Sequence, residues 1–309
     1  MELPVRWKWK LNRLRERINA FFAPKEEEQP KPKLCPSCHT LVGATQTRCH
    51  ECGASTTFSL AAASQSLRRW MPQENPASYM ILGLSAFLYT IGLLGTLDQQ
   101  SNAPQLRGGL SAFFGILGVD SHILYRMGMS LPLSYNLVEP WRFITASFLH
   151  VGLIHIFFNM YSLLDLGPMV EEMYGSARFL FIYVVAGIGG FLLASIFSSP
   201  AVGGSCAIVG LVGVLLGATT GHRRGSLGSL REMLIKWAIY IAAFSLMPGV
   251  SFLGHLGGGL TGFLLGKIMA PNPPLNPSER TRANLMGWGA GLAIIASFVM
   301  VVVKYHSPQ

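Results

Sequence analysis

The sequence predicts an all-α polytopic membrane protein in which a six-helix core is followed by one further transmembrane helix and preceded by a small metal-binding domain. Half of its 309 residues are hydrophobic and only 13% are charged, which excludes a soluble enzyme of ordinary composition. The net charge of +9 comes mostly from the first 70 residues and from short loops between apolar runs, a pattern typical of membrane orientation rather than nucleic-acid binding. Four of the five cysteines fall between residues 35 and 52.

Residues 1–32 are predicted to form a basic amphipathic tail and a linker. Aromatic and aliphatic side chains alternate with Arg and Lys, and the continuous apolar core of a signal peptide is missing. Such a helix can lie on an anionic cytoplasmic membrane surface, and the alternative is a partly disordered solubilising tail. Three consecutive glutamates, Glu26-Glu27-Glu28, lie between prolines and lysines and mark the linker.

Residues 33–55 are predicted to form a zinc ribbon. Two residues separate Cys35 from Cys38, and two separate Cys49 from Cys52, so each pair can supply two thiolates to one tetrahedral zinc ion. Two disulfides are the alternative, but the basic tail indicates the reducing cytosol. Four protein ligands leave no position for water or substrate, so we expect a structural zinc and a small domain that binds a cytoplasmic partner.

After a linker at residues 56–76, seven apolar runs predict seven membrane-spanning helices. They centre on residues 78–97, 150–166, 178–198, 204–220, 233–248, 251–270 and 285–304. The apolar stretch 108–119 is about 12 residues long and too short to span, so we place it in a long loop that lies in the membrane interface. Basic residues place the N-terminal tail and two later loops on the cytoplasmic side, which puts the long loop and the start of the fourth helix on the outer side.

Polar side chains occur at one depth in the second, fourth and sixth runs, where they are costly and usually face a cavity or a partner. His150, His155 and Asn159 lie in the outer half of the second run, and His155 and Asn159 share one helix face. Ser205 begins the fourth run, and His255 lies at the same predicted depth in the sixth. One such residue alone is ordinarily structural. The whole series indicates a functional site.

Glycines four residues apart form a ridge on the fourth and the sixth run. They are Gly213 and Gly217 in the fourth, and Gly258, Gly262 and Gly266 in the sixth. Ridges of small residues let helices approach closely. We expect this packing to bring Ser205 and His255 within hydrogen-bond reach, as a serine nucleophile requires. The alternative is that the glycines serve packing alone.

Together these residues resemble the rhomboid intramembrane serine proteases. The shared motifs are His-x4-His-x3-Asn at 150 to 159, Gly-x-Ser at Gly203 and Ser205, His255 before a glycine ridge, Trp141-Arg142, and Gly167-x3-Glu171-x3-Gly175. The likeness covers about residues 78–270. It implies a catalytic core at 77–270, and a cytoplasmic loop with a seventh transmembrane helix at 271–309.

The resemblance implies that Ser205 is the nucleophile and His255 the general base, with neither a third acid nor a catalytic cofactor. For the oxyanion hole it implies His155, Asn159 and the Ser205 backbone N–H, supported by His150 and by Gly203. The expected reaction is hydrolysis of peptide bonds in or near transmembrane segments of other proteins in the lipid bilayer. The implied setting is a bacterial inner membrane, with the active site open to the outer face.

Two residues depart from the family pattern. Cys206 replaces a glycine after the serine, which predicts crowding of the oxyanion hole, and Val209 replaces an aromatic ring that orients the catalytic histidine. A catalytically weak or inactive rhomboid-like protein that binds transmembrane clients is therefore the alternative. A transporter with a histidine proton relay would need acidic partners inside the helices, where the sequence offers only Asp165 near a helix end.

Overall fold

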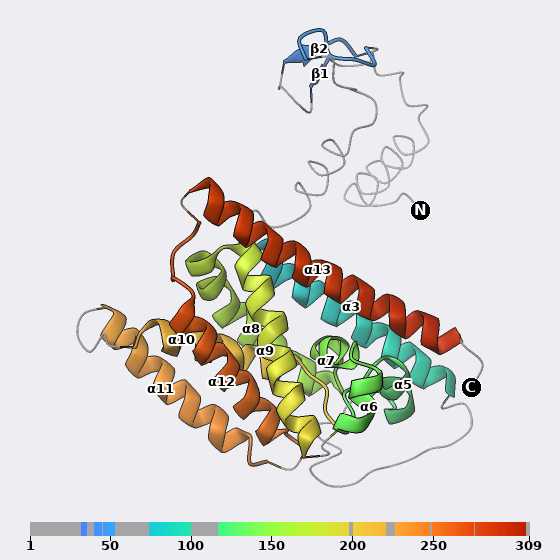
Figure 1. Cartoon of the computed structure of the whole chain (residues 1–309). Helices are drawn as coiled ribbons and strands as arrows, with labels where there is room; N and C mark the ends of the chain where they lie inside the picture. Colours follow the sequence, from blue (N-terminus) through green and yellow to red (C-terminus); the bar gives the residue numbers. More distant parts are fainter. Residues whose placement is uncertain are drawn as a thin grey trace, which may run out of the picture. The chain divides into compact units, whose positions relative to one another are not determined.

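The computed structural model describes residues 32–35, 40–44, 46–52, 74–99, 117–197, 200–220, 226–247, 249–274 and 276–306. The chain divides into two compact units, Met1–Met71 and Pro72–Gln309. In the first unit, strand β1 (Lys33–Leu34) pairs antiparallel with β2 (Leu41–Val42) (Figure 1). The predicted amphipathic tail, the interfacial stretch up to residue 116 and Cys38 lie outside the described residues.

The described part of the second unit is built from helices, which turns and an isolated antiparallel β-bridge between Ser130 and Ala201 connect. Its elements are α3 (Pro76–Gln99), α5 (Ser121–Arg126), α6 (Leu133–Val138), α7 (Arg142–Thr145), η2 (Ala146–Phe148), α8 (Leu153–Tyr174), α9 (Ser176–Ile196), α10 (Ser205–Ala218), α11 (Ser226–Phe244), α12 (Phe252–Ile268) and α13 (Pro277–His306). Each of the seven apolar runs overlaps one helix of this set, from the 14 residues of α10 to the 30 of α13. In the described part of the chain, four helices are long and apolar enough to cross a membrane: α3, α8, α9 and α13. The fold is therefore that of a multi-pass membrane protein, and the six-plus-one arrangement stays a prediction.

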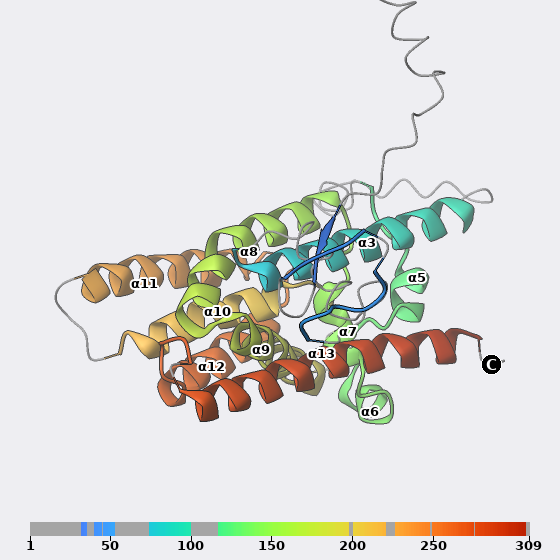
Figure 2. The ribbon, with the colours of Figure 1, turned by 90° about the horizontal axis from the view of Figure 1, so that it is seen from above.

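Helix α10 is short and central. Its 14 residues rise about 21 Å, less than the hydrocarbon thickness of a typical bilayer. It contacts α8, α9, α11 and α12, and it lies among them in both ribbon views (Figures 1 and 2). Most of its side chains are buried, so its apolar composition serves helix packing rather than lipid contact.

The end of the predicted long loop folds into the short helices α5, α6 and α7. The buried guanidinium of Arg142 holds this segment, donating to Glu139 Oε2 at 2.6 Å and to the carbonyl oxygens of Tyr125 at 2.8 Å and Met129 at 3.0 Å. Lys304 of α13 lies 3.6 Å from the other oxygen of Glu139. The Trp141-Arg142 motif thus has a structural reason, because it ties α7 to the preceding helices.

The Gly167-x3-Glu171 motif joins α8 to the start of α3. The buried carboxylate of Glu171 accepts from the backbone N–H groups of Ala77 and Ser78, both at 2.9 Å, and from Ser78 Oγ at 2.7 Å. These amides belong to the first turn of α3, which has no intrahelical partners for them. A Cβ at Gly167 would lie 2.7 Å from Ser78 Oγ, so a larger residue would have to displace the hydroxyl that donates to Glu171.

The glycine ridges of α10 and α12 pack backbone against backbone. A Cβ added at Gly258, Gly262 or Gly266 of α12 would collide with the carbonyl oxygen of Cys206, Gly210 or Val214 of α10, respectively. The ridge on α10 behaves alike, because a Cβ at Gly213 would collide with the carbonyl oxygen of Gly259. The predicted close approach of these two helices is confirmed.

Candidate active site

Ser205 and His255 meet where α10 and α12 begin. Ser205 is the first residue of α10, and His255 is the fourth residue of α12. His255 Nε2 lies 2.8 Å from Ser205 Oγ, and the His255 side chain is buried while Ser205 is half-buried. A hydroxyl hydrogen-bonded to an imidazole is the arrangement that prepares a serine for nucleophilic attack. Because Ser205 starts a helix, its backbone N–H has no partner within the helix.

The turn before Ser205 runs against a histidine of α8. Gly203 has a φ of +126°, which a residue with a side chain rarely adopts. Its N–H donates to the carbonyl oxygen of Ala146 in η2 at 2.9 Å, and this bond anchors the turn. A Cβ at Gly203 would lie 2.6 Å from His155 Nε2. The missing side chain therefore makes room for His155.

Polar atoms without partners gather beside this turn. Asn159 Nδ2 donates to the carbonyl oxygen of His155 at 2.8 Å, and the rings of His150 and His155 meet edge to face with centroids 5.2 Å apart. Within the described residues, both ring nitrogens of His150, Nδ1 of His155 and Oδ1 of Asn159 are buried without a hydrogen-bond partner. Unpaired buried polar atoms are costly, so this cluster suits a polar ligand such as water or a peptide carbonyl.

The six site residues expected in the helical unit lie together at adjoining ends of α8, α10 and α12. Ser205 contacts His255, Gly203 and Gly204 lie against the side chains of His155 and Asn159, and His150 contacts His155. Asn159 Oδ1 would lie 3.6 Å from a Cβ at Gly204.

Two further residues reach the site without a signal in the sequence. Ser245, directly after α11, is buried, and its Oγ lies 2.5 Å from His255 Nδ1 and 2.6 Å from the carbonyl oxygen of Ile241. In the sequence Ser245 looks like any serine at the end of an apolar helix. Tyr183 of α9 donates through its hydroxyl to the carbonyl oxygen of Ser147 at 3.5 Å.

Cys206 points away from the polar cluster, into the contact of α9 with α12. A Cβ at Gly190 would lie 2.6 Å from Cys206 Cβ, and a Cβ at Gly254 would lie 2.8 Å from Cys206 Sγ. The thiol thus occupies a slot that two glycines leave open, and it is buried in a cluster with Phe191. Val209, one turn further along α10, faces Gly259, where a Cβ would lie 3.4 Å from Val209 Cγ1.

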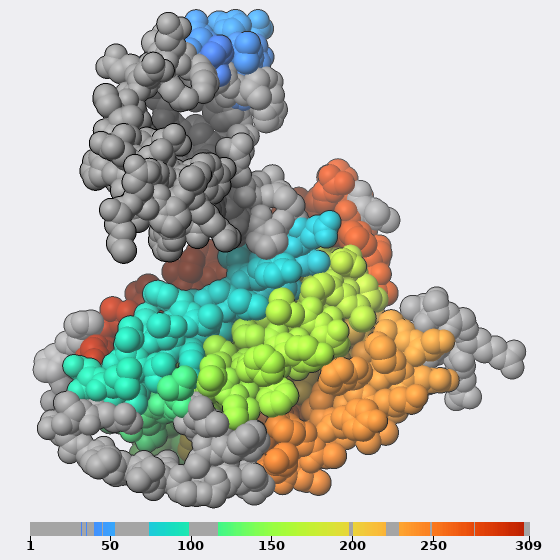
Figure 3. Space-filling view, turned by 180° about the vertical axis from the view of Figure 1, so that it is seen from behind, coloured from blue at the N-terminus to red at the C-terminus, as the bar shows by residue number. Residues whose placement is uncertain are grey.

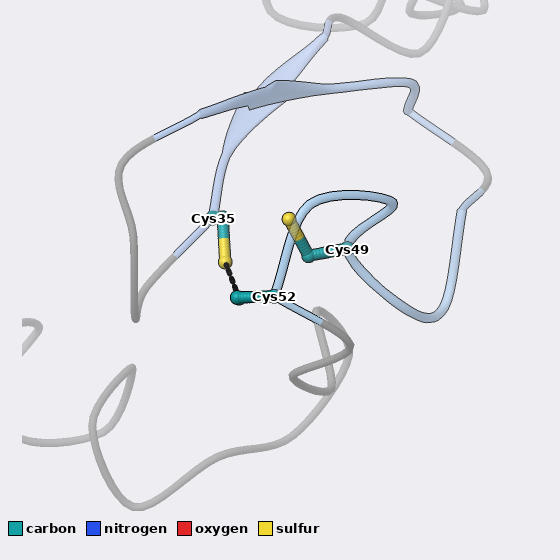
Figure 4. A group of neighbouring side chains, drawn as sticks. All are labelled: Cys35, Cys49 and Cys52. Carbon is teal, nitrogen blue, oxygen red and sulfur yellow. Dashed lines mark hydrogen bonds between the residues drawn. The ribbon is translucent and has the colours of Figure 1, made fainter.

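Three cysteines of the first unit gather beside the β1–β2 hairpin (Figure 4). The sulfur atoms of Cys35, Cys49 and Cys52 all lie within 4.8 Å of one another, and those of Cys35 and Cys52 are 3.6 Å apart. A tetrahedral zinc ion with Zn–S bonds of about 2.3 Å separates its sulfur ligands by about 3.8 Å. The three thiols therefore fit one metal ion.

The fold and this site define a class, a multi-pass helical membrane protein with a serine hydroxyl and an imidazole in contact where two helices begin. Comparison with known proteins narrows the class, because residues 138–272 match the model of the Rhomboid domain. The chain therefore carries a rhomboid domain.

Several rhomboid relatives are similar to this chain. It is 30% identical to "RHOMBOID-like protein 4" of Arabidopsis thaliana over 237 residues. These aligned residues cover 67% of this chain and 55% of the relative. It is 38% identical over 140 residues to "RHOMBOID-like protein 6, mitochondrial" of the same plant, covering 44% and 45%. It is 39% identical over 127 residues to "Rhomboid protease GluP" of Bacillus subtilis, covering 40% and 25%. The chain spans about half the length of the first two relatives and a quarter of the third.

Proposed function

We propose that this protein is an intramembrane serine endopeptidase that hydrolyses peptide bonds in or near transmembrane segments of other membrane proteins. The observation that carries the proposal is the 2.8 Å contact between Ser205 Oγ and His255 Nε2. The rhomboid domain at residues 138–272 and the similarity to a bacterial rhomboid protease support it.

The geometry suits acyl transfer in two steps. His255 Nε2 takes the hydroxyl proton while Ser205 Oγ attacks the peptide carbonyl carbon, and the proton then passes to the leaving amine. This breaks the C–N bond and leaves an ester between Ser205 and the acyl half of the substrate. A water molecule, deprotonated by the same nitrogen, then hydrolyses the ester and restores the serine.

We assign the oxyanion hole to the Ser205 backbone N–H and the side chains of His155 and Asn159. The Ser205 N–H is free of intrahelical bonding at the start of α10. Asn159 Nδ2 donates one hydrogen to the carbonyl oxygen of His155 and has a second hydrogen available to donate. Removing one such donor typically costs about 3 kcal/mol of transition-state stabilisation. His150 supports His155 through their ring contact.

We further propose that the basic tail and basic loops face the cytoplasm and that the start of α10 faces the outer side, as the distribution of Lys and Arg favours. The relatives come from plants as well as from a bacterium, and one is named as mitochondrial, so placement in a bacterial inner membrane stays a prediction. The boundaries at 33–55, 77–270 and 271–309 are likewise part of this proposal.

A structural zinc ion held by Cys35, Cys38, Cys49 and Cys52 completes the proposal for the first unit. Metal analysis of the full chain, purified in detergent, should give about one zinc per chain. Cys49→Ser should lower that content, and cleavage by the helical unit should persist. Unchanged zinc content in Cys49→Ser would contradict the assignment. We assign a cytoplasmic protein partner to this domain as a further part of the proposal.

The central test is cleavage of a model transmembrane substrate with a destabilised helix, reconstituted with the full chain in detergent. Wild-type protein should cleave it and react with a fluorophosphonate probe, whereas Ser205→Ala should do neither. The matched control is Ser195→Ala, because Ser195 is a buried serine of α9 that bonds only to its own helix among the contacts described for it, at 2.8 Å to the carbonyl oxygen of Leu192. A folded wild-type chain that neither cleaves nor labels, yet crosslinks to the substrate, would instead support a client-binding protein.

A further inference from the structure

We propose that Ser245 is a positioning residue that fixes the tautomer of His255, so that its Nε2 presents a lone pair to Ser205. The inference rests on the proposed function, in which His255 is the general base. Ser245 lies just beyond the end of α11, outside the three helices that carry the rest of the site.

The hydroxyl of Ser245 has two close neighbours and one hydrogen to give. Oγ lies 2.6 Å from the carbonyl oxygen of Ile241 and 2.5 Å from His255 Nδ1. A carbonyl oxygen can only accept, so the Ser245 hydrogen satisfies Ile241. The contact with Nδ1 is then a hydrogen bond only if Nδ1 carries a hydrogen and donates it to a lone pair of Oγ.

This arrangement determines which nitrogen is the base. A neutral imidazole carries one proton, and with that proton on Nδ1 the other nitrogen is an acceptor. Nε2 faces Ser205 Oγ at 2.8 Å, so it is ready to take the serine proton. With the opposite tautomer, Nε2 would already hold a hydrogen and Ser205 would keep its own.

Ser245 also suits the charged state of the base. When the proton has moved from Ser205 Oγ to Nε2, the proton on Nδ1 stays in place and still points at the lone pair of Ser245. The Ile241 carbonyl polarises the Ser245 hydroxyl and makes its oxygen a better acceptor, because hydrogen bonds in a chain strengthen one another. Ser245 and His255 are 2% and 6% exposed, so bulk water does not readily replace this contact.

The anchoring of α11 explains how Ser245 keeps its place. Its buried face carries side chains at helical spacing that pack into the core, namely Leu230, Leu234, Ala238 and Ile241. Ser245 continues that face four residues after Ile241 and bonds back to it through both its N–H, at 2.8 Å, and its hydroxyl.

The kinetic test uses the full chain in detergent with the substrate described above. Ser245→Ala should lower kcat by about 10- to 100-fold, the range expected on losing a hydrogen bond to a charged group, with KM within about threefold. Ser245→Thr keeps the hydroxyl and should restore kcat to within about fivefold of wild type, if the loss came from one hydrogen bond. Ser195→Ala removes a hydroxyl from an equally buried serine and should leave kcat unchanged. Wild-type kcat in Ser245→Ala would overturn the proposal.

A spectroscopic readout separates this inference from the proposed function. In protein labelled with ¹⁵N-histidine, the His255 signals, assigned by their loss in His255→Gln, should show a protonated Nδ1 in wild type and Ser245→Thr. Ser245→Ala should move the proton to Nε2 or mix the two forms. If the tautomer responds in this way but the chain does not cleave, the proposed protease function is wrong and the positioning role of Ser245 stands. If the tautomer does not respond, the positioning role is wrong.

If Ser245→Ala does not fold, as judged by thermal unfolding in detergent, Ser245→Cys takes its place. The thiol fills the same space but is a weak hydrogen-bond acceptor. Its kcat should fall at least about tenfold below that of Ser245→Thr. Equal kcat in the two variants would overturn the proposal.

Discussion

Two contacts of opposite kinds hold His255, and each sets a different property of the ring. On one side, α12 touches α10 through glycines whose missing side chains bring backbone against backbone. On the other side, Ser245, which directly follows α11, contacts the histidine through its side chain. Backbone contacts of the first kind allow only one distance between the two helices. Side-chain contacts of the second kind can adjust by rotamer changes.

Of these two contacts, the one made by Ser245 after α11 lies nearer the edge of the helical unit. Helix α11, orange in Figure 3, lies at the edge of the helical unit beside α8. On its outward face Ile239 and Tyr240 are 61% and 70% exposed, whereas ten of the 14 residues of α10 are buried. The glycine ridge therefore sets how far His255 lies from Ser205, and in our proposal Ser245, at the end of α11, sets which nitrogen of His255 carries the proton.

The largest expected effect comes from widening the α10–α12 contact. A Cβ at Gly262 would collide with the carbonyl oxygen of Gly210, and this atom belongs to the backbone and cannot swing away. Gly262→Val should destabilise the protein by about 3 kcal/mol, the upper end of the usual cost of overpacking. It should also lower kcat by about 100-fold or more, since displacing reacting groups by 1 Å has that effect. Thermal unfolding and cleavage in detergent measure the two losses.

Gly259 provides the matched control on the same helix. A Cβ there would meet Val209 Cγ1 at 3.4 Å and no closer atom, which is ordinary van der Waals contact. Gly259→Ala should therefore keep stability and kcat near the wild-type values. Equal damage from Gly259→Ala and Gly262→Val would mean that the separation of α10 and α12 is not what the glycine ridge determines.

An intermediate effect is expected from loosening α11. Leu234 is fully buried and anchors the inner face of that helix. Leu234→Ala should cost about 2–4 kcal/mol of stability through the cavity it leaves. It should lower kcat about three- to tenfold, because a looser α11 weakens the Ser245 contact by a part of a hydrogen bond's free energy.

A double-mutant cycle sharpens that prediction. In a Ser245→Ala background there is no contact left to weaken, so adding Leu234→Ala should lower kcat no further. Additive losses of kcat would show that Leu234 acts on the site by a route that bypasses Ser245. The stability losses should add, and these control for the folding of the double variant.

The close approach of α12 to α10 can be predicted from the sequence, whereas the contact between Ser245 and His255 cannot. The spacing of Gly258, Gly262 and Gly266 is a local pattern, so the approach of α12 to α10 can be predicted from it. The partner of Ser245 depends on how the turn between α11 and α12 folds back, which no spacing reveals. The resemblance to the rhomboid proteases implied that His155 and Gly203 share one site, but their direct contact depends on a φ of +126° at Gly203.

Helix lengths were the other property that could not be predicted from the sequence. The apolar run at 204–220 suggested a spanning helix, yet α10 ends at Ala218 after 14 residues. Composition cannot separate a helix surrounded by lipid from one surrounded by other helices, because both favour apolar side chains. The loop that includes Arg142 likewise gave no sign of its short helices, which depend on buried polar contacts between residues far apart in sequence.

Cys206 is expected to give the smallest effect, although its place next to Ser205 suggested a large one. The thiol lies between Gly190 and Gly254, away from the polar cluster of α8. Cys206→Ala should therefore change kcat/KM by no more than about threefold, a difference below 1 kcal/mol. A maleimide should not inactivate the wild-type protein, since the side chain is 2% exposed. A tenfold rise of kcat in Cys206→Ala would instead show that this residue crowds the oxyanion hole.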